Sequence, residues 1–353
     1  MGMKEVAQSL GISKSTVSLA INNKPGVSED TRKKVMAAMI DLGYKPRRMI
    51  RTLAETEKSV KFFACVGTGN GIPSHYNLAS SFFSELIYGI EQECKKNKFS
   101  LSFATIPLDS FASHLEQERE TCVFDAAILL GTGLSAKQIE FAIGLFPKTV
   151  VLDTFYEHLD VDFVMMNNSM GGYKAASYLY SLGHRSIGYV QCVDRFINVD
   201  LRKRGFSEAL MQNQLTVAQK NYFTVENRID AAKDTLYAVF SARGKSLPTA
   251  VFCETDYIAI GTVKALQDCG LNVPEDISVI GFDDVPEAMV LSPELSTIRV
   301  DKATIGKLAV NRLVEVLKSE NPGPTVKQIV DTYFVLRGSC AECNTNDEAD
   351  LLA

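Results

Sequence analysis

Short apolar runs alternate with longer amphipathic segments through most of the chain beyond residue 59. The apolar runs are Phe62–Val66, Leu101–Ala104, Ala126–Leu130, Thr149–Asp153, Phe163–Met166, Ile187–Val190, Ala250–Cys253 and Val279–Phe282. Helix-length segments separate them and include Phe82–Lys96, Gly171–Leu182, Leu201–Gln212, Ile229–Ala242 and Ile258–Asp268. Continuous apolar strands between helices are typical of parallel sheets covered by helices on both faces. The number of these elements favours two doubly wound lobes over one. Because ligands bind beyond the carboxyl ends of parallel strands, we expect a ligand in the cleft between the lobes.

The first 45 residues have a different pattern, that of a small helical bundle. Val6, Ala7 and Leu10 share one face of a first helix, and Gly11 interrupts the pattern. A turn between two crossed helices often needs a positive φ, which glycine adopts without steric cost. A third helix is predicted to begin after Ser28, a good N-cap, and to stop before residue 43.

Between these two helices the sequence predicts a second helix with an exposed polar end. Ser13 can cap it, Val17 lies on its buried face, and Lys14, Ser15 and Ser18 lie on its exposed face. Exposed polar residues at the start of a second helix are what a major-groove reader presents to base edges. The pattern therefore favours a helix-turn-helix DNA-binding head.

A basic segment follows the head at residues 46–53. It begins with a proline, contains three arginines and ends with Leu53. Arginine in a minor groove together with an apolar wedge between base steps is a device that kinks DNA. We expect residues 1–45 to form the head, 46–58 a hinge helix and linker, 59–340 the two-lobed domain and 341–353 a disordered tail. The resemblance of this domain to a known two-lobed fold, given at the end of this section, implies that the chain crosses between the lobes near residues 163, 292 and 327. The first lobe would then comprise residues 59–163 and 293–326, and the second 164–292 and 327–340.

Charge is divided unevenly along the 353 residues. The whole chain carries a formal net charge of −5, whereas residues 1–55 hold ten Lys or Arg and five Asp or Glu, so that the remainder is strongly acidic. A basic head on an acidic body is the electrostatic footprint of phosphate binding. The alternative, a helical bundle with a merely solvated basic face, does not account for this asymmetry.

Composition limits the other classes of protein. The sequence has no apolar run of about 18 residues and no signal-peptide pattern at its start, so we expect a cytoplasmic, nucleoid-associated protein without a membrane partner. The eight cysteines are scattered and are read as reduced. Cys340 and Cys343 form one CxxC pair, but a zinc site needs about four ligands. We therefore expect neither a metal nor a cofactor.

Catalytic motifs are missing from the sequence. Its four histidines do not have H-x-x-x-H spacing, and neither a G-x-S-x-G elbow nor a Walker loop is found. The glycine-rich stretch at residues 67–71 lacks the last glycine of a dinucleotide-binding loop, since residue 72 is isoleucine. An enzyme is therefore not expected.

The head resembles the DNA-binding domain of the lactose-repressor/galactose-repressor (LacI/GalR) family of bacterial transcriptional regulators. The resemblance lies in Lys4–Ala7, Ser13–Ser18, Pro25–Ser28 and Leu42–Pro46. It implies that Lys14, Ser15 and Leu19 face bases. Further residues in the second helix and the hinge are expected to contact DNA: Ser13, Thr16, Ser18, Asn22, Arg47, Arg48, Ile50, Arg51 and Leu53. Of these, Arg47 and Ile50 depart from the family, which usually has Asn or Ser at the first position and Ala at the second. Ser13, Thr16 and Asn22 would touch phosphates, and Leu53 would be the minor-groove wedge.

The rest of the chain is similar to the effector domain of the same family and, through it, to the type I periplasmic sugar-binding fold. Phe124–Leu129, Tyr180–Ile187 and Val273–Asp284 are among the matching stretches, and the similarity extends over about residues 3 to 340. The resemblance implies an effector site made by seven residues: Phe82, Phe83, Asp153, Arg202, Thr255, Asp256 and Asp283. Several Asp acceptors, one Arg and aromatic faces suit a sugar, because each hydroxyl needs a hydrogen-bond partner. Each residue alone also has a structural alternative: Asp256 and Asp284 could cap helices, and Phe82 could be core.

The sequence therefore predicts an all-α helix-turn-helix head joined to an α/β, two-lobed, periplasmic-binding-protein-like domain. The expected function is that of a homodimeric transcriptional regulator, a repressor as the resemblance implies. We expect it to bind double-stranded operator DNA of pseudo-palindromic sequence and to respond to a small molecule such as a sugar. The alternative is a soluble sugar-binding protein without transcriptional output. The head and the absence of a signal peptide count against that alternative.

Overall fold

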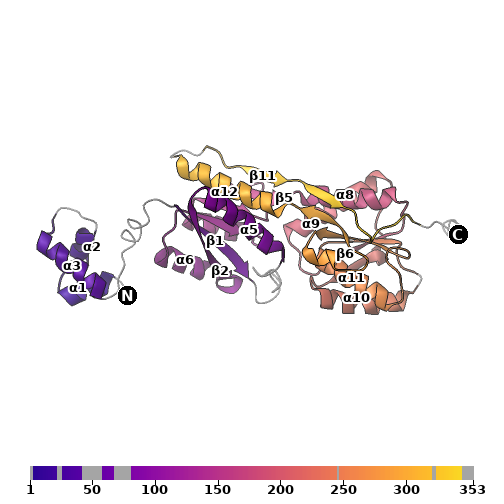
Figure 1. Cartoon of the computed structure of the whole chain (residues 1–353), viewed down its shortest axis with the longest axis horizontal. Helices are drawn as coiled ribbons and strands as arrows, with labels where there is room; N and C mark the ends of the chain where they lie inside the picture. The colour runs from indigo at the N-terminus through magenta and orange to yellow at the C-terminus, as the bar shows by residue number, and fades with distance from the viewer. Residues whose placement is uncertain are drawn as a thin grey trace. The chain divides into compact units, whose positions relative to one another are not determined.

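The computed structural model describes residues 3–21, 26–41, 58–66, 81–244, 246–319 and 323–343, and the chain divides into two compact units, residues 1–58 and 59–353 (Figure 1). The division falls at the predicted end of the linker. The predicted hinge helix lies outside the described residues. Each unit has its own apolar core and is described by itself.

Three helices form the head: α1 (Met3–Leu10), α2 (Lys14–Ile21) and α3 (Glu29–Asp41). Val6, Val17 and Val35 are fully buried between them. Gly11 has a φ of +63° and turns the chain from α1 into α2, as its position predicted. One residue from each helix therefore fixes the core, and the polar positions of α2 remain outside.

Lobe 1 of the larger unit contains a six-stranded sheet in the order β11-β5-β4-β3-β1-β2. Its strands are β1 (Lys58–Val66), β2 (Phe99–Pro107), β3 (Ala126–Leu130), β4 (Thr149–Leu152), β5 (Asp162–Met166) and β11 (Lys327–Val330). Neighbouring residues of β1 face opposite sides of the sheet. Phe62 packs in the cluster that includes α5 (Ser81–Lys96) and α12 (Lys302–Lys318), whereas Phe63 packs in the cluster that includes α6 (Phe111–Thr121) and α7 (Ala136–Leu145). Both faces are thus covered by helices, which explains why the strands are apolar throughout.

Lobe 2 repeats this plan with a sheet in the order β12-β10-β9-β8-β6-β7. Its strands are β6 (Ile187–Cys192), β7 (Tyr222–Val225), β8 (Ala250–Cys253), β9 (Ser278–Asp283), β10 (Ser296–Val300) and β12 (Thr332–Val335). Helices α8 (Asn168–Ser181) and α9 (Ile197–Gln212) pack against each other, as do α10 (Ile229–Arg243) and α11 (Asp256–Asp268). The described residues also include three single 3-10 turns, Leu108–Ser110, Gln219–Asn221 and Pro286–Met289. The two lobes confirm the predicted fold class.

The chain crosses between the lobes three times, each time later than the sequence predicted. It passes from β5 to α8, from β10 to α12, and from β11 to β12, hence near residues 167, 301 and 331 rather than 163, 292 and 327. Strand β5 continues to Met166 in lobe 1, and β11 pairs with it in parallel. Strand β10 stays in lobe 2 beside β9. The predicted crossings fell too early because a crossing follows the carboxyl end of a strand, not its start.

Residues 341–343, which were expected to belong to the disordered tail, form hydrogen bonds with lobe 2. The Ala341 carbonyl lies 3.1 Å from a ring nitrogen of His184, and the Cys343 backbone N–H donates to the Leu182 carbonyl at 2.8 Å. The predicted tail therefore begins at least three residues too early, and residues 344–353 lie outside the described part. Within the described residues all eight cysteines are free, and no cluster of His, Cys, Asp or Glu could hold a metal ion. None of the helices described is long and apolar enough to span a bilayer.

Candidate functional site

Ser13 caps the N-terminal, polar end of α2. The Ser13 hydroxyl accepts from the Thr16 backbone N–H at 3.0 Å and lies 2.7 Å from the Ser15 hydroxyl. This cap satisfies one of the free N–H groups at the start of the helix and fixes its first turn. Lys14 and Ser15 are exposed beside it, while Val17 is buried. The head therefore offers a short, rigid, polar helix end of the kind that enters a major groove.

The remaining predicted DNA contacts fall into two groups. Thr16, Ser18 and Leu19 lie on α2 with partly exposed side chains. The others, Asn22, Arg47, Arg48, Ile50, Arg51 and Leu53, lie outside the described residues, and so does the minor-groove wedge. Their roles stay predictions.

In the larger unit, polar side chains predicted for the effector site gather where strands of both lobes end, and we call this place the cleft. Asp153 follows the last residue of β4 in lobe 1 with a φ of +58° and is buried. Its carboxylate accepts from the Thr132 hydroxyl and, at 2.7 Å, from the Asn198 side-chain amide of α9 in lobe 2. Burial raises the pKa of the Asp153 carboxyl to about 6, although the Thr132 hydrogen bond and the nearby Arg202 charge act in the opposite direction. Asp153 thus links the lobes and can gain or lose a proton near neutral pH.

Arg202 lies one helical turn after Asn198 on α9 and is buried. Its Nε donates to the Asn168 Oδ1 at 2.9 Å, and its Nη2 lies 3.2 Å from the Asp283 Oδ1. The guanidinium also packs 3.7 Å from the centroid of the Phe282 ring. A planar cation held on several sides is preorganised to donate to a ligand at fixed angles.

Asp283 ends β9 with a φ of +111°, a conformation that turns the chain sharply at the carboxyl edge of the lobe 2 sheet. Burial raises the pKa of its carboxyl, while the charges of Arg202 and Lys302 act to lower it. Asp153 and Asp283 therefore come from different lobes, and the positive charge of Arg202 lies close enough to lower the pKa of both carboxyls. The structure brings together these three of the residues predicted from the sequence.

Lys302 is a contact between the lobes that the sequence did not indicate. It is buried at the start of α12, and its ammonium donates to the Asp283 carbonyl at 2.8 Å and forms an ion pair with Glu85 at 3.0 Å. The same ammonium lies 5.5 Å from the centroid of the Phe82 ring. Because α12 belongs to lobe 1 and Asp283 to lobe 2, the lysine holds the lobes together at the edge of the cleft.

Thr255 and Asp256 have contacts within lobe 2. The Thr255 hydroxyl caps α11 by accepting from the Ile258 N–H at 3.3 Å. The two oxygens of the Asp256 carboxylate accept from the Val285 N–H and the Thr297 hydroxyl, and the side chain is fully buried. Burial and the neighbouring Asp283 raise the pKa of Asp256 well above its usual range. These contacts match the structural alternative for Asp256 and leave its predicted role in the cleft a prediction.

The two predicted aromatic contacts differ in position. Phe82 and Phe83 begin α5 with ring centroids 5.2 Å apart, edge to face. Phe83 is fully buried in the lobe 1 core, whereas Phe82 lies against Lys302. Of the pair, Phe82 is therefore the one placed beside the cleft residues.

Two further polar groups were missed in the sequence. Asn198 is buried, and among the described residues its Oδ1 has no hydrogen-bond partner. Glu254 is fully buried at the end of β8, where it accepts from the Tyr189 hydroxyl and from Arg195 at 2.7 Å. A spacing of four residues between Asn198 and Arg202 on one helix was the available signal, but the helix was predicted to start only at residue 201.

Two family profiles match the chain. The profile described as "Bacterial regulatory proteins, lacI family" matches residues 2–47, and the profile described as "Periplasmic binding protein-like domain" matches residues 176–340. The first stretch corresponds to the head. The second contains most of lobe 2 together with α12 and β11 of lobe 1.

Curated relatives match over nearly the whole chain. The chain is similar to the ribose operon repressor of Haemophilus influenzae, with 34% identity across 96% of this chain and 98% of the relative. It is also similar to the HTH-type transcriptional repressor PurR of the same organism, with 28% identity across 91% of this chain and 92% of the relative.

Solved structures show the same fold. A lac repressor dimer bound to operator and the anti-inducer ONPF matches with a TM-score of 0.70 and 21% identity, over 97% of this chain and 99% of that one. A transcriptional regulator CelR–cellobiose complex matches with a TM-score of 0.70 and 21% identity, over 96% and 99%. A LacI family regulator from Enterococcus faecium with bound ribose matches with a TM-score of 0.66 and 23% identity, over 81% and 100%.

The head excludes the alternative of a binding protein without transcriptional output, and the relatives are repressors rather than enzymes. A capped DNA-reading helix, a two-lobed domain with polar groups converging from both lobes, and relatives that match from end to end agree on one family. This chain belongs to the lacI family of bacterial regulatory proteins and is a ligand-responsive, DNA-binding transcriptional repressor.

Proposed function

We propose that the effector of this repressor is a monosaccharide, with a pentose such as ribose as the first candidate, bound between the lobes. The observation that carries the proposal is the convergence of Asp153, Asn198, Arg202 and Asp283 at the carboxyl edges of the two sheets.

The chemistry of these four groups suits hydroxyls. A sugar hydroxyl donates one hydrogen bond and accepts others, so it needs acceptors and donors at fixed positions. Asp153 and Asp283 supply carboxylate acceptors, and Arg202 supplies donors. Asn198 has a buried Oδ1 that can accept from a ligand hydroxyl.

Relatives support a sugar. One relative with 34% identity is a ribose operon repressor, and one solved structure of the same fold has bound ribose. Other relatives are HTH-type transcriptional repressors called PurR, one of them with 28% identity. The carboxylates of the cleft favour a hydroxylated ligand, and a purine is kept as an outcome of the test.

The effector acts on DNA binding through the angle between the lobes. A ligand that contacts Asp153 in lobe 1 and Arg202 in lobe 2 replaces or strengthens the direct contact between Asn198 and Asp153, and so selects one interlobe arrangement. Two heads of a dimer read the two halves of a pseudo-palindromic operator, and the arrangement of the lobes sets how well both heads reach it. A coupling of about 1–3 kcal/mol changes operator affinity about 5- to 150-fold.

The test measures binding and response separately. Calorimetric titration of the purified full chain with ribose, cellobiose and guanine identifies the ligand class, and the same ligands are added to a gel shift with upstream operator fragments. We expect ribose to bind and to change the gel shift, and Asp283→Asn to lose ribose binding while still shifting operator. Guanine binding without ribose binding refutes the sugar proposal, and a normal ribose response in Asp283→Asn refutes the proposed contacts.

A further inference from the structure

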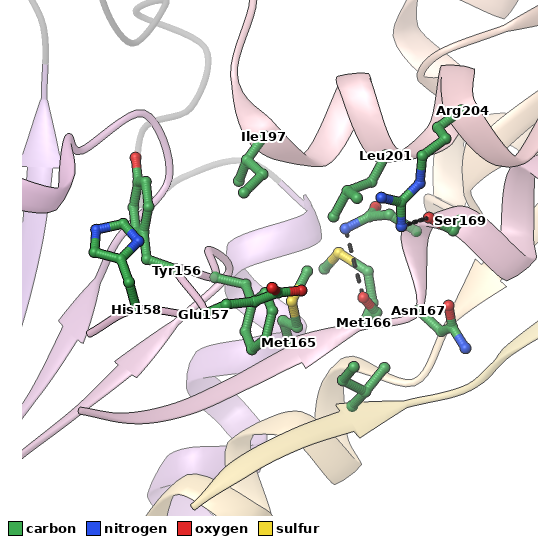
Figure 2. A pocket seen from close by; sticks show the side chains of 13 residues that line it. Tyr156, Glu157, His158, Met165, Met166, Asn167, Ser169, Ile197, Leu201 and Arg204 are labelled. Carbon is green, nitrogen blue, oxygen red and sulfur yellow. Dashed lines mark hydrogen bonds between the residues drawn. The ribbon is translucent and has the colours of Figure 1, made fainter. Parts of the chain in front are cut away.

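A second cavity, of about 510 Å³, lies beside the cleft at the first crossing between the lobes. Lobe 1 lines it with the loop after β4 and the end of β5, and lobe 2 lines it with the first turn of α8 and with α9 (Figure 2). Cavities that hold small molecules have volumes of about 300–1,000 Å³. The size is therefore that of a ligand site.

This cavity is distinct from the effector cleft. On α9 the residues that line it are Ile197, Leu201 and Arg204, whereas Asn198 and Arg202 bond to the cleft residues from the neighbouring side of the helix. Residues spaced three and four apart share a helix face, so the two sets belong to two faces of α9. None of the four cleft residues of the proposed sugar site lines the cavity.

The middle of the cavity is apolar. Met165 and Met166 of β5 line one side, and Ile197 and Leu201 of α9 lie on the opposite side (Figure 2). Methionine side chains are flexible and polarizable and adapt to flat or irregular apolar ligands. The cavity can therefore hold an apolar or aromatic body between two lobes.

Opposite charges enter the cavity from different lobes. Glu157 points into it from the loop of lobe 1, and Arg204 lies on the lobe 2 side, where its guanidinium donates to the Ser169 hydroxyl at 3.3 Å (Figure 2). Both charged side chains are exposed enough to turn toward a ligand. A bound anion is favoured beside Arg204, and a bound cation is favoured beside Glu157.

We propose that this cavity is a second binding site and that it takes a small amino carboxylate with an apolar or aromatic body. The carboxylate of the ligand binds Arg204 and Ser169, its amino group binds Glu157, and its body lies against Met165 and Met166. A ligand that binds both charged residues bridges the lobes.

The site has a direct connection to the effector cleft. Asn168 lines the cavity, and its Oδ1 accepts from the Nε of Arg202. A ligand that moves the first turn of α8 therefore moves a partner of the arginine that faces Asp283. This coupling depends on the proposed function of the cleft, but binding in the cavity does not.

The test uses three matched compounds and a signal from the cavity itself. The full chain is labelled at its methionine methyl groups and titrated, without sugar, with 4-(aminomethyl)benzoate, 4-methylbenzoate and 4-methylbenzylamine. The signals of Met165 and Met166, assigned by single Met→Leu changes, report binding, and the exposed Met211 and Met289 serve as internal controls. We expect saturable shifts at Met165 and Met166 only, with the strongest binding for the compound that has both charges.

Two variants test the charges. Arg204→Gln should weaken binding of the two carboxylates about three- to five-fold and leave the amine unchanged, whereas Glu157→Gln should weaken binding of the two amines and leave 4-methylbenzoate unchanged. Arg228→Gln, which removes an exposed arginine elsewhere in lobe 2, is the control. Absence of a saturable shift at Met165 and Met166 up to about 10 mM overturns the site. Equal binding of all three compounds to all variants overturns the proposed ligand class. Because the titration contains no sugar, either failure leaves the proposed sugar effector untouched.

Discussion

Replacing Arg202 with methionine should destabilise the larger unit strongly. Arg202 and Asp283 are a buried ion pair, with side chains that are 5% and 11% exposed. The change keeps an apolar stem against Phe282 but removes the charge. It leaves the buried Asp283 carboxylate without the guanidinium that pairs with it, although the Lys302 charge stays nearby, and it leaves Asn168 Oδ1 without its donor.

The expected size follows from that burial. Removing one partner of a buried pair costs about 3–5 kcal/mol. A domain of this size loses about 2 °C in melting temperature for each kcal/mol, so Arg202→Met should melt about 6–10 °C below the unaltered protein. The matched control is Arg228→Met, because Arg228 pairs with Asp230 at the surface, where both side chains are about half exposed or more. An exposed pair contributes at most about 1 kcal/mol, hence about 2 °C.

Calorimetric unfolding of the full chain at pH 7 measures both variants. Adding Asp283→Asn to Arg202→Met should recover part of the lost stability, since the second change removes the unpaired carboxylate. The reasoning is refuted if Arg202→Met melts within 2 °C of the unaltered protein, or if the second change lowers the melting temperature further.

Three other changes test separate parts of the molecule. The pKa of the Asp153 carboxyl is about 6 in the fold against 3.8 ordinarily, so the folded state binds its proton more tightly. This group's contribution to stability is therefore full below about pH 4, and about 3 kcal/mol of it is lost as the pH rises through 6. Asp153→Asn should remove most of that loss, measured by urea unfolding at pH 4 and pH 8, whereas parallel pH profiles of the two proteins would contradict it. Gly205→Ala should lower the free energy of unfolding by about 1–3 kcal/mol, because an added Cβ would lie 1.8 Å from the Ser169 carbonyl oxygen. Gly144→Ala is the control and should not lower it, since the space around Gly144 is open. Equal melting temperatures of the two variants would count against the close packing of α8 and α9. Lys14→Ala should change which operator bases are preferred in a competition gel shift, and equal weakening on every sequence would mean that this lysine contacts only phosphate.

The fold could be predicted from the sequence wherever a strand is buried on both faces of its sheet. Strands such as β3 and β8 are buried along their whole length, so their residues form apolar runs that the sequence shows directly. Strand β11 has alternating exposed positions at the edge of its sheet and offers no such run. It could not be recognised from local pattern, since it exists because it pairs with β5, more than 150 residues earlier.

The cleft was predictable only in part, for a related reason. Asp153 and Asp283 end apolar strands, and that position marks them in the sequence. Lys302 has no local signal, because its partners Glu85 and the Asp283 carbonyl are brought to it by the sheets of two different lobes. Asn198 was missed because its helix was predicted to start only at residue 201, whereas α9 begins at Ile197.

The order in which the chain visits the two sheets has an evolutionary consequence. Residues 168–300 are one uninterrupted stretch that supplies every element of lobe 2 except the edge strand β12, which joins β10 antiparallel at the end of the chain. A single gene segment can thus be exchanged with that of a relative and bring a complete half of the pocket with it. The protein that receives the segment has to provide only the short strand β12, which completes the edge of the lobe 2 sheet. Within this architecture, recombination offers a short route to a new ligand for an old operator.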